Sequence, residues 1–549
     1  MNTIRPMANR ADFPIISIRL HKKLLTKFIF CDNIILYAHK SNYRRIQMKS
    51  TIKLISLALA LVMLFASFVA CADTGKENPV TTENATTNAP SGSDAETTAD
   101  LYDENGYLKS NLPDELDFGG ETITVLWWND VERPEFYVED TNGEMVNDAI
   151  YQRNANVESK MGVTLDWVDI KGQYNNNVGK AYSDHVGNMY ESGDSTYDLM
   201  SAHSRTIALT AMNGYCADLM DLEYLDFSMP WWPTVMKDTA TIGDSMYFVT
   251  GDVSINSIHQ MYAIFYNKDV LERFPDLVEP ATHVQNKNWT IETLHLMTKD
   301  MYKDLDGSNT ANELDFYGFT TLSWHLDAIY YGAGLRQAEK DEEKLLKISD
   351  DYYSTKAIDL CDRMGEWIKQ GDVYVNSSNY ANTFISGNAL MVMARHKDVA
   401  EKIVDAGFSY GIVPIPKYNS EQENHITCVG NPVSFYSIYT LSKDLNRAAA
   451  VLECWASEAY RLTTPALFET TMKLRYSETS VESEMYDLIR AGIIFDFGRL
   501  FNSSLANMSD QWDNCAVDGG SWATKSKAMM RTLGTQLEKI TNSFAEIAQ

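Results

Sequence analysis

Two groups of aromatic and polar residues follow apolar runs that we expect to be strands. Trp128, Asn129 and Asp130 stand at the end of the first run, and His203 and Arg205 follow the third. A tryptophan offers a large rigid face, while amide, carboxylate and guanidinium groups form directional hydrogen bonds. These residue types suit a pocket for a ring compound with hydroxyl groups, such as a sugar. The alternative is that Trp128 packs in the core and that His203 and Arg205 are solvated or ion-paired.

Other tryptophans are expected to be structural. Trp127 precedes Trp128 in a strand and therefore should face the opposite way, into the core. Trp231 and Trp232 are expected to pack beneath a loop.

Sequence motifs give little support for catalysis. The chain has no P-loop, no HExxH and no GxSxG. Acidic residues are abundant, so a pair of carboxylates in a glycan-active enzyme stays open as an alternative.

We predict no cofactor and no metal site. The acidic loop from Asp304 to Asp315 resembles a calcium loop, but Gly307 comes directly after Asp306, which is too early for an EF-hand, and a polar turn is favoured.

Apolar periodicity predicts alternating strands and helices in the first part of the fold. Strands are expected at residues 121–129, 162–169 and 198–203, with helices at 145–161 and 178–191. This order indicates a mostly parallel sheet with helices on both faces. Ligands of such sheets bind beyond the carboxyl ends of the strands, where both polar groups lie.

The N-terminal region reads as an export signal. Residues 1–47 are basic and are expected to be an upstream extension, with translation starting at Met48. In residues 48–70, two lysines precede an apolar core of about 16 residues, which is short of the roughly 20 that a membrane span needs. Phe68-Val-Ala-Cys71 resembles a bacterial lipobox, with Phe where Leu is usual, so Cys71 is expected to carry lipid. A plain secretory cleavage is the alternative. Residues 71–110 then form the anchor and a polar tether.

The charge of the chain excludes one class of partner. The formal net charge is −28, and the first 70 residues carry 11 of the 47 basic and 2 of the 75 acidic residues, so the remainder has a net charge of about −37. Nucleic acid is not expected as a partner, because phosphate binding needs a basic face.

The cysteine spacing gives no zinc pattern and assigns no disulfide. The cysteines are Cys31, Cys71, Cys216, Cys361, Cys428, Cys454 and Cys515.

Four segments together resemble one protein family. The first segment is residues 251–274, GDVSINSIHQMYAIFYNKDVLERF. A strand is expected at 261–266, and it is followed by YNKD and a short helix at 270–273. Asp269 is expected to be the N-cap of this helix. The other three segments occur in the order in which the family has them. They are GYCADL at 214–219, FISGNALMVMAR at 384–395 and FSYGIVPIPK at 408–417. Over about residues 118–460 the chain resembles the extracellular solute-binding proteins that include the maltose binders and serve ABC importers.

The resemblance implies an α/β fold with two lobes, each a mixed sheet flanked by helices, and a ligand cleft between them. The implied first lobe comprises residues 111–260 and returns at 411–442. The implied second lobe comprises residues 261–410, and residues 443–549 form C-terminal helices mainly in that lobe. A helix is expected after Asn288, with Thr290 and Glu292 in its first turn.

The resemblance also implies further ligand contacts and a function. Residues at matching positions are Gln260, Trp324, Arg395, His396, Gly430 and Asn431. For Trp324, as for Trp128, a place in the core is an equal alternative. The implied protein is a monomeric lipoprotein at the extracellular face of the bacterial cell membrane. It is expected to capture a carbohydrate, specifically an oligosaccharide, and to deliver it to an ABC permease. It is not expected to catalyse a reaction on this ligand. A binder of peptides or polyamines and a surface-anchored glycan-active enzyme are the alternatives.

Overall fold

The computed structural model describes residues 102–548, except residues 104–105, 176, 343, 376–378, 404–405 and 476–478. Every described residue belongs to one compact unit. The expected upstream extension, signal peptide, Cys31, lipidated Cys71 and most of the tether lie outside the described residues. Within the described part, no helix has both the length and the apolar character to cross a membrane.

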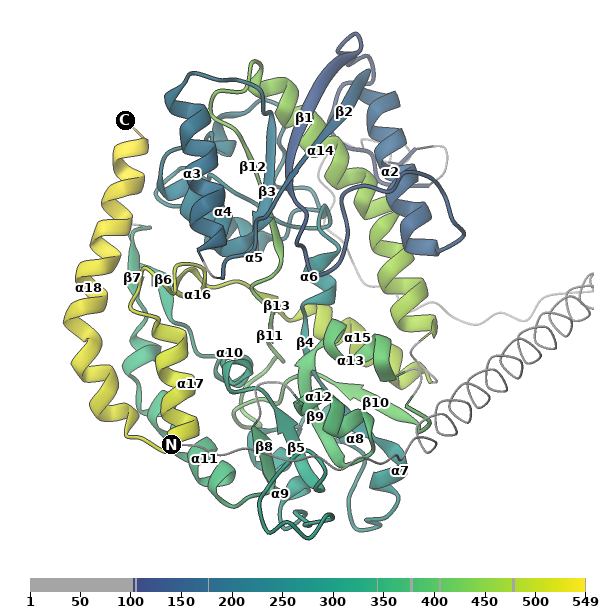
Figure 1. Ribbon diagram of the computed structural model, residues 1–549, viewed down its shortest axis with the longest axis vertical. Helices are drawn as coiled ribbons and strands as arrows, with labels where there is room; N and C mark the ends of the chain where they lie inside the picture. Colours follow the sequence, from purple (N-terminus) through teal and green to yellow (C-terminus); the bar gives the residue numbers. More distant parts are fainter. Residues whose placement is uncertain are drawn as a thin grey trace, which may run out of the picture. The chain divides into compact units, whose positions relative to one another are not determined.

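The first lobe is built on a four-stranded sheet in the order β12-β3-β1-β2. Three strands are parallel, and β12 runs antiparallel to β3, with Ser434 opposite His203. Helices α3 and α4 cover one face of the sheet, and α2 and α14 cover the other (Figure 1). The strands are β1 (Glu121–Trp128), β2 (Val163–Ile170), β3 (Leu199–His203) and β12 (Ser434–Ile438). The helices are α2 (Met145–Met161), α3 (Val178–Glu191), α4 (Ser204–Met212), η2 (Leu219–Asp221), α5 (Thr234–Ala240) and α14 (Leu445–Arg461).

The second lobe is built on a five-stranded sheet in the order β10-β4-β9-β5-β8. Here β5, β8 and β9 are parallel, and β4 is antiparallel to both β9 and β10. The strands are β4 (Tyr262–Asn267), β5 (Tyr317–Thr321), β8 (Val373–Val375), β9 (Ala389–Arg395) and β10 (Tyr410–Val413), with a separate ribbon of β6 (Ala338–Lys340) and β7 (Leu346–Ile348). The helices are α7 (Lys268–Leu271), α8 (Pro280–Gln285), α9 (Ile291–Thr298), η3 (Ser323–His325), α10 (Asp327–Gly332), η4 (Asp350–Tyr353), α11 (Thr355–Lys369), α12 (Tyr380–Ile385), α13 (His396–Ile403) and α15 (Ser480–Ala491).

The chain crosses between the lobes along neighbouring segments. Helix α6 (Asn256–His259) leads into β4, and Met261 forms a bridge with Val429 on the returning segment. That segment contains β11 (Thr427–Cys428), which pairs in parallel with β13 (Ile493–Ile494). The crossings therefore lie side by side between the two sheets (Figure 1). The expected lobe boundary at residue 410 falls at the start of β10, which pairs only within the second sheet.

The C-terminal helices are divided between the lobes. Helix α14 packs on α2 of the first lobe, and α15 packs on β10 of the second. In α18 the indole of Trp522 donates to the carbonyl of Tyr352 in the second lobe at 3.0 Å. Near the other end of α18, Phe544 stacks on Tyr247 of the first lobe, with ring centroids 5.6 Å apart. The long helix thus contacts both lobes. The remaining elements are η5 (Pro465–Arg475), α16 (Phe497–Leu500), α17 (Met508–Asp518) and α18 (Trp522–Ile547).

Local sequence signals explain several element ends. Helix α2 stops at Gly162, whose φ of 59° is left-handed and favours glycine. Helix α9 begins after Thr290, whose hydroxyl accepts from the Thr293 N–H, as expected. The N-cap predicted at Asp269 is wrong. The side chain of Asn267 accepts from the Val270 N–H at 2.9 Å, because the strand ends there and its backbone is extended, so α7 begins one residue earlier than Asp269.

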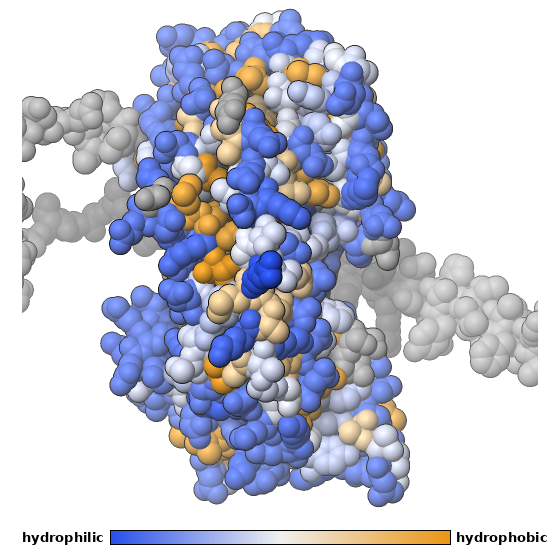
Figure 2. All heavy atoms as spheres, turned by 90° about the vertical axis from the view of Figure 1, so that its left-hand side faces the viewer, coloured by the Kyte–Doolittle hydropathy of each residue, from blue (hydrophilic) through white to orange (hydrophobic). Residues whose placement is uncertain are grey.

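Buried polar anchors fix the aromatic core of the first lobe. Trp231 and Trp232 are fully buried, as expected, and their indole N–H groups donate to the Glu453 carboxylate at 2.9 and 2.7 Å. The surface on the α18 side is mostly hydrophilic, with hydrophobic residues gathered around its middle (Figure 2). The cysteines of the described part are buried free thiols: Cys216, Cys361, Cys428, Cys454 and Cys515.

Candidate functional site

Most of the predicted site residues lie at two sheet edges that approach each other between the lobes. In the first lobe, β1 and β3 end and β12 begins at one edge. In the second lobe, β5 and β9 end and β4 begins at one edge. A side chain from the loop after β1 reaches Arg395 at the end of β9, so these edges approach each other. We call this region the interlobe site.

Trp128 and His203 form the floor of the first lobe's edge. The Trp128 side chain is fully buried, and its indole N–H donates to the Ser434 hydroxyl at 3.1 Å. Trp127 is partly buried and packs against the core, with its ring 5.4 Å from that of Phe136, as expected. For Trp128 the alternative of a place in the core holds, because its side chain lies beneath Gly172, where a Cβ would lie 2.4 Å from the Trp128 Cβ.

His203 is held neutral beside Trp128. Burial, and then the positive charges of Arg205 and Arg499, keep the pKa of His203 well below its usual range. Its Nδ1 accepts from the Arg205 backbone N–H at 3.1 Å and caps α4, so the ring proton resides on Nε2. The Tyr174 ring lies 5.9 Å from the imidazole and 5.8 Å from the Arg205 guanidinium. This corner therefore combines a neutral donor, an aromatic face and a cation.

Asn129 and Asp130 hold the loop after β1 in place. The Asn129 amide donates to the Asp169 carboxylate at 2.7 Å. The Asp130 carboxylate accepts from the backbone N–H groups of Gly172 and Gln173 at 2.7 and 3.1 Å. Both side chains thus join the ends of β1 and β2.

Gln260 and Arg395 belong to a network that joins the lobes. The fully buried Gln260 side chain donates to Glu132 and accepts from Arg395, each at 3.1 Å. Arg395 also pairs with Glu132 at 3.1 Å and with both carboxylate oxygens of Asp398 at 2.8 and 3.0 Å. Gly430 is required beside this network, because a Cβ there would lie 2.7 Å from both the Arg395 and Gln260 side chains.

His396 lies apart from these residues. Its side chain is buried against Phe265 and Tyr486, with Nε2 3.4 Å from the Tyr486 hydroxyl. Burial lowers the pKa of His396 to about 3. The neighbouring Arg395 side chain follows the interlobe network, whereas the His396 ring packs toward α15.

Trp324 supplies the exposed aromatic face of the second lobe's edge. Its side chain is 50% exposed, and its ring meets His325 edge-on at 6.4 Å. His325 is fully buried and is enclosed edge-on by Tyr262 and Tyr380 at 4.9 and 5.3 Å. A half-exposed indole on an aromatic base offers a flat surface on which the apolar face of a ring compound can stack.

Asn431 and Arg205 meet an arginine that was not predicted. Arg499 of α16 donates to the Asn431 side chain at 2.9 Å and pairs with Asp327 of α10 at 2.7 Å. The Arg205 guanidinium donates to the Arg499 carbonyl at 3.2 Å. The Arg499 side chain is nearly buried. Its contacts with Arg205, Asn431 and Asp327 connect α4, the return crossing and the second lobe behind the interlobe site.

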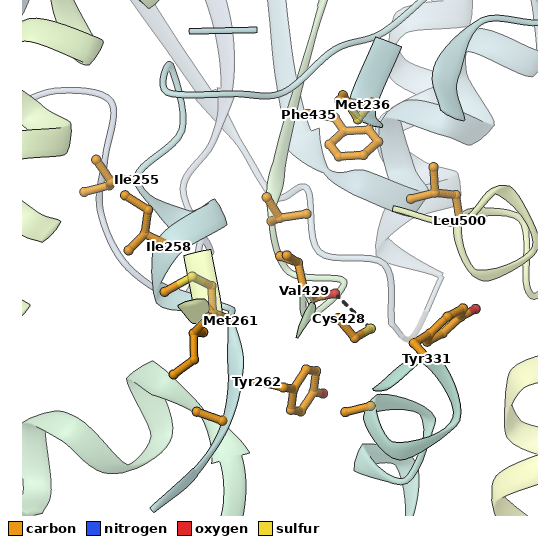
Figure 3. Packing of buried hydrophobic residues seen from close by; sticks show 14 of the residues in the cluster. Met236, Ile255, Ile258, Met261, Tyr262, Tyr331, Cys428, Val429, Phe435 and Leu500 are labelled. Atoms are coloured by element: carbon orange, nitrogen blue, oxygen red, sulfur yellow. Dashed lines mark hydrogen bonds between the residues drawn. The ribbon is translucent and has the colours of Figure 1, made fainter. Parts of the chain in front are cut away.

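A small cavity lies next to Arg499 at the crossings. Its volume is about 10 Å³, room for about one water molecule. Tyr331 and Val429 line it together with Ser204, and Figure 3 shows Tyr331 and Val429 on either side of this part of the core. The Tyr331 hydroxyl has no hydrogen-bond partner among the described residues.

Glu132, Lys397, Arg499 and Asp327 are the polar residues of the site that sequence reasoning missed. Glu132 follows the predicted Asp130 by two residues, so its loop position was the one available signal. Arg499 lies in the C-terminal region, outside the segments that carried the family resemblance.

The acidic loop of the second lobe is a polar turn on the lobe's outer part. Carboxylate oxygens of Asp304, Asp306 and Asp315 lie within 4.8 Å of one another. Asp304 accepts from the Gly307 N–H at 2.7 Å, and Asp315 accepts from the Leu305 N–H at 3.0 Å. These bonds to the loop's own backbone define a polar turn, and its preference over a calcium loop stays a prediction.

Two lobes, each a mixed sheet flanked by helices and joined by adjacent crossings, define the class of two-lobe binding proteins. The sequence places the chain within that class. Residues 177–463, more than half of the chain, match the model of the bacterial extracellular solute-binding protein family, and the chain belongs to this family. None of the curated protein sequences matches the chain.

Solved structures share the fold at low sequence identity. A cyclo/maltodextrin-binding protein, complexed with maltotetraose, has a TM-score of 0.50 and 12% identity, covering 78% of this chain and 98% of its own. The GacH receptor of Streptomyces glaucescens, described unliganded and with acarbose, has a TM-score of 0.50 and 16% identity, covering 76% of this chain and 99% of its own. Both confirm the two-lobe fold.

Proposed function

We propose that this protein is the substrate-binding lipoprotein of an ABC importer, that it captures a carbohydrate between its lobes and that it delivers this ligand to a permease. Membership of the extracellular solute-binding family supports binding and transport. The observation that carries the carbohydrate assignment is the half-exposed Trp324, which follows β5 at the second lobe's sheet edge. The two structural neighbours were solved with maltotetraose and with acarbose, which agrees with this ligand class.

The proposed mechanism is closure without chemistry. The crossings act as a hinge, and the lobes close on a ligand that contacts both sheet edges. One sugar ring stacks on Trp324, and its hydroxyl groups bond to the planar polar groups of the opposite edge. Cys71 anchors the mature chain at the extracellular face, and the tether allows a monomer to reach the permease. An oligosaccharide suits the extended pair of edges better than a single sugar.

Thermal unfolding against a panel of mono- and oligosaccharides tests this proposal. A ligand that binds only the folded state raises the unfolding midpoint. Stacking that buries roughly 80 Å² of apolar surface contributes about 2 kcal/mol, so Trp324→Ala should weaken binding about 30-fold. Tyr190→Ala, which removes an exposed aromatic from α3, is the matched control and should leave affinity unchanged.

Two results would contradict the proposal. If no carbohydrate shifts the midpoint while a peptide or polyamine does, the ligand class is wrong. If Trp324→Ala and Tyr190→Ala bind equally well, the ligand does not stack on Trp324.

A further inference from the structure

We propose that three donors at the second lobe's sheet edge form a subsite for one carboxylate, and that Glu132 of the first lobe fills this subsite in the present structure. The donors are Gln260 Nε2, Arg395 Nη1 and Lys397 Nζ. They lie 3.1, 3.1 and 2.7 Å from a single oxygen, Oε2 of Glu132. Three donors from two segments, Gln260 on one and Arg395 with Lys397 on the other, converge on one oxygen, which is the geometry of an anion site.

The central donor, Arg395, is held in place without Glu132. Both oxygens of Asp398 fix the Arg395 guanidinium, and the Tyr380 hydroxyl donates to Asp398 at 3.0 Å. These residues all belong to the second lobe. Because Arg395 is anchored within the second lobe, its guanidinium stays in place when Glu132 withdraws.

The charges of the subsite match one anion. Arg395 and Lys397 carry two positive charges, and Asp398 carries one negative charge, which leaves one positive charge for a partner. Glu132 neutralises it in this structure. A second carboxylate would add an uncompensated negative charge in a partly desolvated place, so a ligand carboxylate has to displace Glu132.

The subsite is partly exposed at Glu132, Lys397 and Arg395. The Glu132 and Lys397 side chains are each 22% exposed and the Arg395 side chain is 15% exposed. They stand on the same sheet edge as Trp324, since Trp324 follows β5 and Arg395 ends β9. This inference rests on the proposed function and narrows it: the ligand is an acidic saccharide that places one ring on Trp324 and one carboxylate on Arg395 and Lys397.

Chemical rescue tests the subsite without any sugar. Glu132→Ala removes the internal carboxylate and should lower the unfolding midpoint by a few degrees. Acetate should restore most of this loss, while acetamide and chloride at equal ionic strength should not. The added substitution Lys397→Met should abolish the rescue, and Lys402→Met on the same helix should leave it intact. Acetate that stabilises no better than acetamide would overturn the proposal, and phosphate that rescues better than acetate would replace the carboxylate with a phosphate.

Calorimetry with a uronic-acid-containing oligosaccharide and its neutral counterpart tests the ligand class. Glu132→Gln should raise affinity for the acidic glycan about fivefold, because the competitor is gone, and leave the neutral glycan within about twofold. Lys397→Met should lower affinity for the acidic glycan about tenfold. Equal responses of both glycans would overturn the ligand assignment. If acetate rescues but no glycan binds, the carboxylate subsite stands and the carbohydrate proposal fails.

Discussion

Glu453 offers a direct test of how burial competes with hydrogen bonding in this fold. Its carboxylate accepts from the indole N–H groups of Trp231 and Trp232 and from the Asp226 backbone N–H. The three donors favour the ionised form. Burial opposes them and raises the pKa of Glu453 to about 7. Because the folded pKa exceeds the unfolded value of 4.5, the stabilisation is complete below pH 4.5 and is lost as the pH rises through 7.

The non-titrating variant Glu453→Gln isolates this effect. Between pH 8 and pH 6 the folded wild type takes up nearly one proton more than the unfolded chain, which stabilises it by about 1.3 kcal/mol. The variant loses one acceptor and leaves an indole N–H unsatisfied, at a pH-independent cost of about 1–3 kcal/mol. The stability gap between wild type and variant should therefore widen by about 1.3 kcal/mol on acidification from pH 8 to pH 6.

Urea unfolding followed by tryptophan fluorescence at pH 6, 7 and 8 measures the gap. Taking differences between the two proteins removes the contribution of the other titrating groups. A gap that stays constant over this range would show that the three donors keep Glu453 ionised and would refute the argument that burial dominates.

Three further predictions concern single contacts. Arg499→Met leaves the Asp327 carboxylate buried without its partner and should destabilise the protein by about 3–5 kcal/mol in thermal unfolding, and a loss under 1 kcal/mol would contradict the assigned pair. Asn267→Ala should lower the free energy of unfolding by about 1 kcal/mol, because the helix loses its cap, and Asp269→Ala should lower it by less. A larger loss for Asp269→Ala in urea unfolding would show that Asp269 is the cap. In α18, a Cβ added at Gly534 would have no atom within 4 Å. Gly534→Ala should therefore stabilise the protein by about 1 kcal/mol, because alanine has the higher helix propensity. A loss of stability in the same assay would contradict the open space at this position.

The elements of the fold were predictable because local patterns determine them. Helices α2 and α3 have the bounds that their apolar periodicity predicts, and the glycine after α2 marks its end. The strand β4 was recognisable as a continuous apolar run, since it is buried along its whole length. The cap of α7 was missed because Asn267 and Asp269 are both good capping residues, and only the backbone angles of the strand end decide between them.

The site was only partly predictable because side-chain partners depend on tertiary structure. A strand end placed Trp128 near the interlobe site, and the family resemblance placed Trp324 there, but neither gave the exposure of the side chain. Trp128 is covered by a neighbouring glycine loop, and Trp324 is half exposed. Glu132 and Arg395 are separated by 263 residues along the chain, so no local pattern could pair them. Arg499 reaches the site from a helix of four residues near the C-terminus.

The central claim is that the protein holds a carbohydrate intact between its lobes. The most direct test is to incubate the purified protein with the glycan that raises its unfolding midpoint most and to recover that glycan by chromatography and mass spectrometry. We expect a one-to-one complex that returns the glycan unchanged and whose affinity falls with Trp324→Ala. Recovery of a shortened glycan would contradict it and would identify the protein as a glycan-active enzyme.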